Sequence, residues 1–346
     1  MNIYHSTTLL PKVTILIPVF NEQDNLPACL NCVISQSYSP GCLEIIVIDG
    51  GSTDKTFAIA REYGNRYSFV RVVQLPGLNV PQRLNAGATD AEGEILVRVD
   101  ARSRPSTDYV IKLVSLLLKT EVFHVGVKLK AISDTRIGRV IALALSHPFG
   151  VGNSQHRTSD NSSGAEGGYL GGVRKKDFFS VGGYDPDCDY TEDDEFSLRL
   201  IQYGKKVLYT PDIEVPYICR GSLISLGLQF FRYGKHKQKV LRKHGRMPSI
   251  RPYIPLAFVS AIVVLLPLSL IDSYFFFALF SLMFVYIGSS ITLSIISAIK
   301  KRELVFLALP IIFATLHLSY GIGELFGIVK FVGIMRVRQI FAKGHG

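Results

Sequence analysis

The stretch VTILIPVFNE, residues 13–22, decides the fold class of this chain. Its first seven residues are almost all apolar and rich in β-branched side chains, which is typical of a strand buried on both faces. A second stretch of this kind, LEIIVID at residues 43–49, follows after a segment with a helical pattern at 23–36. Strands that alternate with helices in this way predict an α/β fold with a mostly parallel sheet covered on both faces.

The alternation continues toward residue 100. STDKTFAIAREYG, residues 52–64, has the pattern of a helix with Ser52 or Thr53 near its N-cap and Gly64 at its end. RVVQL and EILVRVD then predict two further strands, the last of them ending at Asp100. In such sheets ligands bind beyond the carboxyl ends of the strands, so these ends are where a site is expected.

Polar side chains stand at several of these strand ends. Asn21 and Glu22 follow the first strand, Asp49 ends the second, and Asp100 ends a later one. One aspartate at such a place is most often a turn cap, but the repeated occurrence favours a ligand site. No GxGxxG or GxxxxGK[ST] motif is present, so dinucleotide and P-loop sites lose their main support.

Acidic residues also gather in GGYDPDCDYTEDDEFSLRL, residues 182–200. Thr191 can cap a helix that begins at Glu192, with Asp194 at the capping-box position, and acids favour helix N-termini. The stretch nevertheless holds seven carboxylates, more than a cap needs. The residues alone leave two interpretations equally open, an ordinary capped helix and a general base that stays ionised at neutral pH.

Charge divides the chain into two parts. Residues 1–214 carry 22 Lys and Arg against 25 Asp and Glu, whereas residues 215–346 carry 16 against 3. The mean hydropathy of +0.26 is high for a soluble protein. A near-neutral front and a basic, apolar back predict a cytosolic domain on a membrane anchor. Nucleic acid is not an expected partner, because the basic residues flank apolar segments and form no separate domain.

Three apolar runs follow residue 250. Residues 254–271 and 274–299 are long enough to span a bilayer, and the cations Arg251 and Lys300 at the two ends predict that both ends are cytosolic. The run at 304–329 contains Pro310, His317 and Glu324. If it crossed fully, the basic tail would lie outside, against the positive-inside rule, and the sequence leaves open whether it spans or dips in and returns. An acid inside a membrane is a candidate for function or for a snorkelling structural role.

The domain organisation follows from these observations. We expect a catalytic domain at 1–214, a basic amphipathic region at 215–252, membrane segments within 253–334 and a basic tail at 335–346. The helical stretch LISLGLQFFRYGKHKQKVLRKHGR at 223–246 mixes apolar, aromatic and basic residues, as helices on anionic membrane surfaces do.

Two other features bear on function. Residues 146–168 form a long polar segment rich in Gly and Ser, and loops of this length are usually functional or disordered. The chain has five Cys, and Cys29 and Cys32 form a CxxC without a second pair at zinc spacing. Reduced thiols of a cytosolic domain are therefore expected.

Taken together, these segments resemble the inverting glycosyltransferases of family 2, whose nucleotide-sugar-binding domain has the Rossmann-like GT-A fold. The resemblance covers about residues 12–250. The matching segments are ILIPVFNE (15–22), VIDGGSTDKT (47–56), VRVDARSRP (97–105), YLGGVRKKDFFSVGGYD (169–185), TEDDEFSLRL (191–200) and QFFRY (229–233). VRVDA, FGVGNSQHRTS, QFFRYG and HLSYGIG are similar to the membrane-anchored ExoA type, which extends lipid-linked exopolysaccharide.

The resemblance implies roles on the donor side. Pro18, Asn21 and Glu22 would line the nucleotide pocket. Asp49 would accept hydrogen bonds from the uracil, and Asp100 from the ribose or diphosphate region. The family's second-strand signature usually reads DDGSTD, and here glycine stands at the second position.

The resemblance also implies roles for catalysis and for the acceptor. Asp193 would be the base that deprotonates the acceptor hydroxyl, and Glu192 would set its position and pKa. The residues expected on the acceptor side, or closing over the diphosphate, are Gly171, Gly172, Gln229, Arg232 and Tyr233. One base and one cationic clamp for the departing diphosphate are the minimum set for transfer with inversion.

The place of the family's DXD motif is taken by Asp100-Ala101-Arg102, and Arg102 cannot ligate a metal. Three outcomes are open. Asp100 alone holds Mg²⁺ or Mn²⁺ whose other ligands are diphosphate and water, Arg102 itself contacts the phosphates, or Arg102 turns away and pairs with an acid. A divalent cation is expected, but with weaker dependence than where both acids are present.

The function implied is transfer of a hexose, with glucose as the default, from a UDP-sugar to a polyprenyl-diphosphate-linked sugar in exopolysaccharide or glycan synthesis. The enzyme would be a multi-pass inner-membrane protein with a cytosolic catalytic domain, in contact with lipid and with other polysaccharide-assembly proteins. Two alternatives remain: a polyprenyl-phosphate hexose synthase acting on a bare lipid phosphate, and a non-catalytic membrane scaffold. A processive synthase is disfavoured because few helices remain for an export channel.

Overall fold

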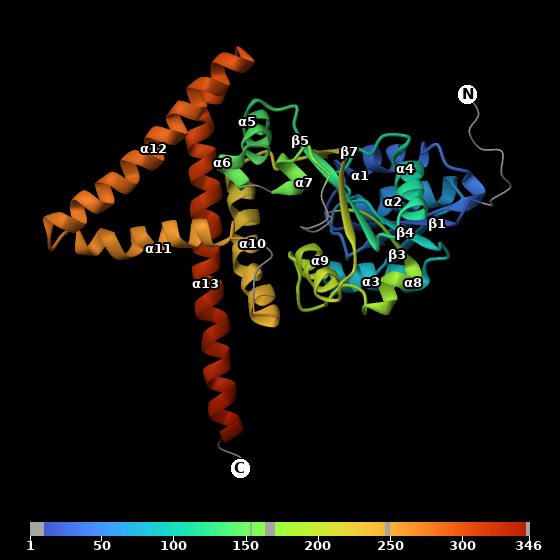
Figure 1. Cartoon of the computed structure of the whole chain (residues 1–346). Coiled ribbons are helices and arrows are strands. Elements are labelled where there is room, and N and C mark those ends of the chain that lie inside the picture. Colours follow the sequence, from blue (N-terminus) through green and yellow to red (C-terminus); the bar gives the residue numbers. More distant parts are fainter. Residues whose placement is uncertain (1–9, 153, 163–169, 246–249, 344–346) are drawn as a thin grey trace. The chain divides into compact units, whose positions relative to one another are not determined.

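The computed structural model describes residues 10–152, 154–162, 170–245 and 250–343. The chain divides into two compact units (Figure 1). The catalytic unit comprises Met1–Leu129 and Asp160–Tyr217, and the helical unit comprises Lys130–Ser159 and Ile218–Gly346. The expected domain boundary at 214 falls close to Tyr217, whereas residues 130–159 group with the C-terminal helices.

A seven-stranded sheet in the order β3-β2-β1-β4-β6-β5-β7 forms the core of the catalytic unit. Four parallel strands lie on one side, and β6 then joins β4 antiparallel, with Val97 opposite Gly172. The strands are β1 (Val13–Val19), β2 (Leu43–Asp49), β3 (Val70–Gln74), β4 (Ile95–Arg98), β5 (His124–Ile132), β6 (Gly171–Arg174) and β7 (Val207–Ile218). The mostly parallel α/β sheet expected from the sequence is confirmed.

Both faces of the sheet are covered by helices, which is why the strands are apolar throughout (Figure 1). Alternate residues of a strand go to opposite faces, so that Ile15 joins one buried cluster and Leu16 the other. The first cluster includes side chains from α1 (Leu26–Ile34), α2 (Thr56–Arg66) and α4 (Tyr109–Lys119), and the second from α3 (Val80–Asp90), α8 (Lys175–Ser180) and α9 (Glu192–Gln202). A short 3₁₀ helix, η1 (Pro40–Cys42), precedes β2.

The helix expected at 52–64 begins and ends later than the sequence pattern indicates. Its N-cap is Lys55 rather than Ser52 or Thr53, and it continues past Gly64 to Arg66. The reason lies in the preceding loop, where the Ser52 hydroxyl donates to Asp49 and the Thr53 amide donates to Asn21. The polar groups that would cap the helix thus build the loop at the strand ends instead.

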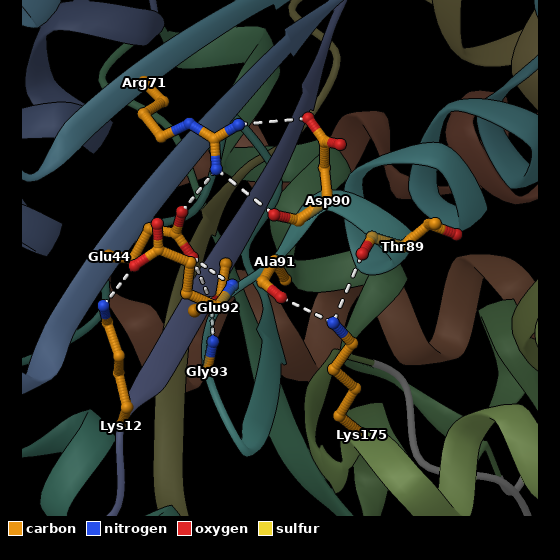
Figure 2. A network of polar contacts seen from close by, with 10 residues as sticks. Lys12, Glu44, Arg71, Thr89, Asp90, Ala91, Glu92, Gly93 and Lys175 are labelled. Carbon is orange, nitrogen blue, oxygen red and sulfur yellow. Dashed lines mark hydrogen bonds and ion pairs between the residues drawn. The ribbon is translucent and has the colours of Figure 1, made fainter.

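A polar network lies at the opposite, amino-terminal end of the parallel strands (Figure 2). Buried Glu44 accepts hydrogen bonds from Thr14 Oγ1 at 2.6 Å, the Glu92 amide at 2.8 Å and Arg71 Nη1 at 2.7 Å. Burial alone would raise the pKa of Glu44, but these hydrogen bonds outweigh it and lower the pKa below its ordinary value. Glu44 therefore ties β1, β2 and β3 together as an ionised group.

We expect Glu44→Gln to lower the free energy of unfolding by about 2 kcal/mol, because hydrogen bonds to a charged group are lost. A carboxylate whose pKa is lowered by folding stabilises above its unfolded pKa, and this contribution is lost as the pH falls through the folded pKa. The difference from the wild type should therefore shrink below about pH 4.3. Thermal unfolding followed by circular dichroism measures it. Glu92→Gln is the control, since this exposed side chain pairs with Lys12 at the surface and should change little.

The helical unit contains α5 (Arg136–Leu145), α6 (Pro148–Val151), α7 (Gln155–Thr158), α10 (Leu223–His244), α11 (Tyr253–Leu268), α12 (Ser273–Lys301), η2 (Leu304–Ala308) and α13 (Leu309–Lys343). Its buried cluster joins α5 to the start of α13, with Ile141, Leu145, Phe313 and Leu316 among its members. Two helical stretches, Ser273–Lys301 and Leu304–Lys330, are long and apolar enough to cross a membrane among the described residues, and α11 is a shorter apolar helix.

Two expectations for this unit are refined. The first apolar run ends its helix at Leu268, and Asp272 then caps α12 by accepting from the Tyr274 amide at 2.9 Å. Part of the polar segment 146–168 forms the short helices α6 and α7, while residues 153 and 163–168 lie outside the described part of the chain.

Candidate active site

Asp49 anchors the loop that follows β2. Its Oδ2 accepts from the amides of Gly51 and Ser52 and from Gln74 Nε2, each at 3.0 Å, and its Oδ1 accepts from Ser52 Oγ at 2.5 Å. Gly51 has φ +88°, in the left-handed region that favours glycine. The side chain is fully buried. Asp49 thus anchors the turn after β2, which is the most frequent role of a single aspartate at a strand end. Its contact with a uracil stays a prediction.

The loop after β1 is joined to the loop after β2 through Asn21. This residue has φ +53°, its Oδ1 accepts from the Thr53 amide at 2.9 Å, and its own amide donates to Ser52 Oγ at 2.9 Å. Pro18 lies in β1 opposite Ile48, three residues before Asn21. Asn21 therefore belongs to a connected pair of loops at the carboxyl ends of β1 and β2, and Pro18 lies near the end of the strand that leads into it.

Arg102 turns toward Glu22. Its Nε donates to Glu22 Oε1 at 2.8 Å, and Asn25 Nδ2 donates to the other oxygen of Glu22 at 2.7 Å. This is the geometry of the third sequence alternative, in which Arg102 pairs with an acid. The pair brings the loop after β1 and the loop after β4 together, so Glu22 and Arg102 lie at the same edge of the sheet as Asp49 and Asp100.

Arg83 of α3, which the sequence analysis did not single out, explains the glycine at position 50. Its Nη1 donates to the carbonyl of Val19 at 2.6 Å, and a Cβ added to Gly50 would lie 2.4 Å from this same nitrogen. The guanidinium thus occupies the space that a second aspartate would need. Its buried Nε has no hydrogen-bond partner within the described residues. The sequence did not indicate this contact, because a single arginine in an amphipathic helix is not a distinctive pattern.

The centre of the acidic cluster is Arg98, the last residue of β4. Its Nε lies 3.0 Å from Asp100 Oδ1, its Nη2 3.0 Å from Glu192 Oε1, and its Nη1 2.9 Å from Asp193 Oδ1. The arginine side chain is 8% exposed. One buried guanidinium therefore holds the strand-end acid and the two acids of the first turn of α9 together. The sequence analysis missed this residue, although a lone cation within ILVRV was a signal, since buried charges need partners.

Electrostatics in this cluster keep the arginine charged and raise the proton affinity of Asp193. Burial would lower the pKa of Arg98, but Asp100, Asp193 and Glu192 raise it well above its usual range. Burial is the main cause that raises the pKa of Asp193 well above its ordinary value. Arg98 opposes this effect, and Glu192 adds to it by repulsion. The helix N-terminus therefore does not keep this carboxyl acidic, as the sequence suggested, because burial outweighs it.

The start of α9 at Glu192 agrees with the sequence, but its cap does not. Thr191 stands at the N-cap position without a capping hydrogen bond from its side chain. Its hydroxyl instead lies 3.4 Å from the Cys188 carbonyl. Two carboxylates of the first turn, Glu192 and Asp193, contact Arg98, whereas Glu195 pairs with Arg199.

The pH dependence of activity should follow from the raised pKa of Asp193. A base works only when deprotonated, so activity is lost as the pH falls through this pKa. Glu192→Gln keeps the shape but removes a repelling charge, so it should lower the pKa of Asp193 and move the acid limb of kcat/KM to lower pH. Asp212→Asn changes an exposed acid on β7 and should leave the profile unchanged. An unshifted limb in the Glu192 variant would contradict the assignment.

The two glycines expected on the acceptor side have packing reasons of their own. Gly171 has φ +99°, and an added Cβ would lie 1.9 Å from the carbonyl oxygen of Val125. Gly172 pairs with Val97 of β4, and an added Cβ would approach Leu117 to 3.3 Å. The sheet therefore requires Gly171 where β6 passes between β4 and β5. An acceptor contact remains a prediction.

The expected closing residues lie in the helical unit, on α10. Gln229 Nε2 donates to Tyr233 Oη at 2.7 Å, one helical turn apart. Arg232 stands between them in the sequence and is exposed. Their closing over a diphosphate or an acceptor stays a prediction.

A metal ion would find one protein ligand here, not a complete set. Asp100 Oδ1 accepts from Arg98, Arg102 pairs with Glu22, and no group of three or more His, Cys, Asp or Glu among the described residues is placed to hold a metal ion. Asp100 therefore fits a divalent cation that a nucleotide diphosphate brings with it, since Mg²⁺ commonly keeps one or two carboxylates plus phosphates and water.

The comparisons with known proteins identify the family and agree with this fold. The profile described as Glycosyl transferase family 2 matches residues 14–173. The succinoglycan biosynthesis protein ExoA of Rhizobium meliloti (strain 1021) is 31% identical over 250 residues, which cover 70% of this chain and 74% of ExoA. This chain belongs to glycosyltransferase family 2 and is a glycosyltransferase that resembles ExoA.

Two further proteins extend the likeness over most of the chain. The dolichyl N-acetyl-α-D-glucosaminyl phosphate 3-β-D-2,3-diacetamido-2,3-dideoxy-β-D-glucuronosyltransferase of Methanococcus voltae is 26% identical and covers 92% of this chain and 97% of its own length. The mannosyltransferase PcManGT of Pyrobaculum calidifontis, solved with GDP-Man and Mn²⁺, superposes with a TM-score of 0.60 at 20% identity, covering 92% and 88% of the two chains. The second comparison supports the GT-A fold.

Proposed function

We propose that this protein transfers a hexose, with inversion, from a UDP-sugar to a polyprenyl-diphosphate-linked sugar at the cytosolic face of the inner membrane, in exopolysaccharide or lipid-linked glycan synthesis. The observation that carries the proposal is the Arg98-centred cluster, in which Arg98 contacts both the buried Asp193, the base that we propose, and the strand-end Asp100. The names of the relatives support the pathway class, since one acts in succinoglycan synthesis and the other on a dolichyl-linked sugar phosphate.

The reaction needs one base and a stabilised leaving group. Asp193 takes the proton of the acceptor hydroxyl while that oxygen forms a bond to the anomeric carbon from the face opposite the diphosphate. The bond from the anomeric carbon to the diphosphate oxygen breaks, and UDP leaves with the bonding electrons. The transition state resembles an oxocarbenium ion, by analogy with glycoside hydrolysis. Arg98 holds Asp193 in place through its 2.9 Å contact.

Charge on the departing diphosphate requires cationic stabilisation. A divalent cation bound to the diphosphate and to Asp100 would supply it as a Lewis acid. Glu22 holds Arg102 nearby at 2.8 Å, and exchange of this carboxylate for a phosphate would let Arg102 contribute a second cation.

We expect Mn²⁺ to bind measurably only together with UDP, because the protein alone offers Asp100 without a second acid at position 102. Electron paramagnetic resonance of free Mn²⁺, with and without UDP, measures this binding. Asp100→Asn should abolish the UDP-dependent part, and Asp212→Asn should not. Tight binding of Mn²⁺ without nucleotide would contradict the single-ligand site. Complete loss of turnover in EDTA, restored by Mn²⁺, would argue against Arg102 as the principal clamp.

The direct test of function supplies membranes containing the protein with radiolabelled UDP-glucose and two acceptors, polyprenyl phosphate and a polyprenyl diphosphate that carries one sugar. The proposal predicts label on the glycosylated diphosphate. Label on the bare phosphate would instead make the protein a lipid-phosphate hexose synthase. Label on neither, together with no thermal shift by any UDP- or GDP-sugar, would favour the non-catalytic scaffold.

A further inference from the structure

The packing within the helical unit bears on which apolar segment enters the membrane. An inference on this point rests on the membrane location proposed above. The third apolar run, now η2 and α13, passes a test of length and hydropathy as well as α12 does. The surroundings of the two helices differ, however, and the difference concerns the basic helix α10.

Helices α10 and α13 lie side by side and run in the same direction (Figure 1). A Cβ added to Gly323 would lie 2.2 Å from the Phe231 carbonyl oxygen, and one added to Gly327 would lie 2.5 Å from that of Lys235. Both pairs are four residues apart on their own helix, so the two helices advance together by one turn. Glycine at these positions lets the backbones touch, which fixes the level of each α10 residue against α13.

The charged groups of α10 are thereby placed at the level of the supposed third span. Lys235 lies over the ring of Phe326, with its Nζ 5.6 Å from the ring centre. Burial and then the charges of Lys330, Lys239 and Arg232 lower the pKa of Lys235, which shows these cations to be close together. If α13 crossed the bilayer, this group of cations would lie toward its far side, and cations within hydrocarbon are strongly disfavoured.

The short connection between β7 and α10 also argues against an α13 that crosses the bilayer. The last strand of the catalytic unit, β7, ends at Ile218, and α10 begins at Leu223. The four connecting residues reach at most about 14 Å. The first turns of α10 lie beside Thr315 and Ser319, near the middle of the third run. A crossing α13 would therefore draw the start of α10 into the membrane, together with the residues that connect it to β7.

Glu324 has a partner on α10 as well. It is fully buried, and Gln238 Nε2 lies 3.4 Å from its Oε1. The acid that the sequence placed inside the membrane thus faces a helix of the same unit. On its outer side α13 presents a single stripe of exposed apolar residues, made by Ile311, Leu318, Ile322 and Val329. An apolar stripe beside the basic residues of α10 fits a surface that lies in the plane of the membrane interface.

The α11–α12 hairpin, in contrast, has an end that is apolar and exposed. Residues 273–278, at the start of α12, are exposed around the whole helix and include Phe275, Phe276 and Phe277. Leu266 at the end of α11 and Leu270 in the turn that follows are exposed as well. A helix that is apolar and exposed on every side is stable only in lipid.

We propose that, among the described residues, the α11–α12 hairpin enters the bilayer, whereas α13 lies along the cytosolic membrane face and ends on that face. The partner of this surface is a bilayer with anionic headgroups, which the cations Arg232, Lys235, Lys239 and Lys330 would contact while the stripe on α13 meets the acyl chains. The chain then has two membrane segments, not three.

Reporter fusions to the full chain test this topology. Alkaline phosphatase, active only outside the cytoplasm, and green fluorescent protein, fluorescent only inside, are each fused after Gly346. The proposal predicts that the green fluorescent protein fusion fluoresces and that the alkaline phosphatase fusion shows only background activity. A matched control carries an added apolar 20-residue segment between Gly346 and the phosphatase and should gain phosphatase activity.

Carbonate extraction of the same membranes distinguishes an error in the proposed topology from an error in the proposed membrane location. Retention in the pellet with a cytosolic C-terminus supports the hairpin. Retention with an active C-terminal phosphatase would overturn the inference while leaving the membrane location intact. Release into the supernatant would show that no segment enters the bilayer and would contradict the proposed location itself.

Discussion

Asp193→Asn is expected to reduce turnover by roughly 10²- to 10⁴-fold while UDP-sugar binding persists, because a positioned general base contributes about this factor. Asn preserves the shape of the side chain and can still contact Arg98 Nη1, which lies 2.9 Å from Asp193 Oδ1. The loss should therefore appear in kcat more than in KM. Steady-state kinetics with the glycosylated polyprenyl diphosphate acceptor, beside calorimetric titration of UDP, make the separation.

Asp194→Asn is the matched control for this variant. Asp194 is the next residue in the first turn of α9, and its charge is only a minor cause of the raised pKa of Asp193. The control should retain activity within a few-fold. Near-full activity of the Asp193 variant, or equal losses in both, would mean that another group takes the proton.

Removal of Arg98 is expected to have the second large effect. Arg98→Met leaves Asp100, Glu192 and Asp193 without the guanidinium that contacts all three, and breaking a buried ion pair by removing one partner costs about 3–5 kcal/mol. The pKa of Asp193 should also rise, since Arg98 lowers it. Activity at neutral pH should therefore fall more steeply than stability alone explains, and the acid limb should move to higher pH.

Arg98→Lys keeps the prediction testable if the Met variant fails to fold. Lysine retains the charge but lacks the planar fork that reaches three carboxylates, so a folded enzyme with a loss of roughly tenfold to a hundredfold is expected. Arg71→Met is the control, because Arg71 pairs with Glu44 at the other end of the strands and should lower stability without moving the pH profile. If the Lys variant kept both full activity and an unchanged pH profile, Arg98 would have only a structural role.

Much of the catalytic fold could be predicted from the sequence, because it depends on local patterns. The apolar runs of β1 and β2 match the observed strands at Val13–Val19 and Leu43–Asp49. Less predictable were the helix boundaries of α2, since the Ser52 hydroxyl donates to Asp49 and the Thr53 amide donates to Asn21 instead of these residues capping the helix. Competition of this kind between a cap and a long-range contact has no local signature.

The candidate site could be predicted in part. Asp100 was singled out from its position at a strand end and Asp193 from the family resemblance, but their common partner Arg98 was not recognised. Arg98 and Asp193 are 95 positions apart in the sequence and are brought together only by the sheet and by the packing of α9 against it. The contact between Arg83 and Gly50 was missed for the same reason. Residue types indicate that charge is present, and only the fold shows which charges meet.

The chemistry assigned to Asp193 is tested most directly by the anomeric configuration of the product. A single base that activates the acceptor hydroxyl for direct attack predicts a single displacement, so that an α-linked UDP-hexose gives a β-linked product. Nuclear magnetic resonance of the new anomeric proton, after transfer to the glycosylated polyprenyl diphosphate, reads the linkage through its coupling constant. A β linkage is the result that this account predicts, and an α linkage from the same donor would contradict it.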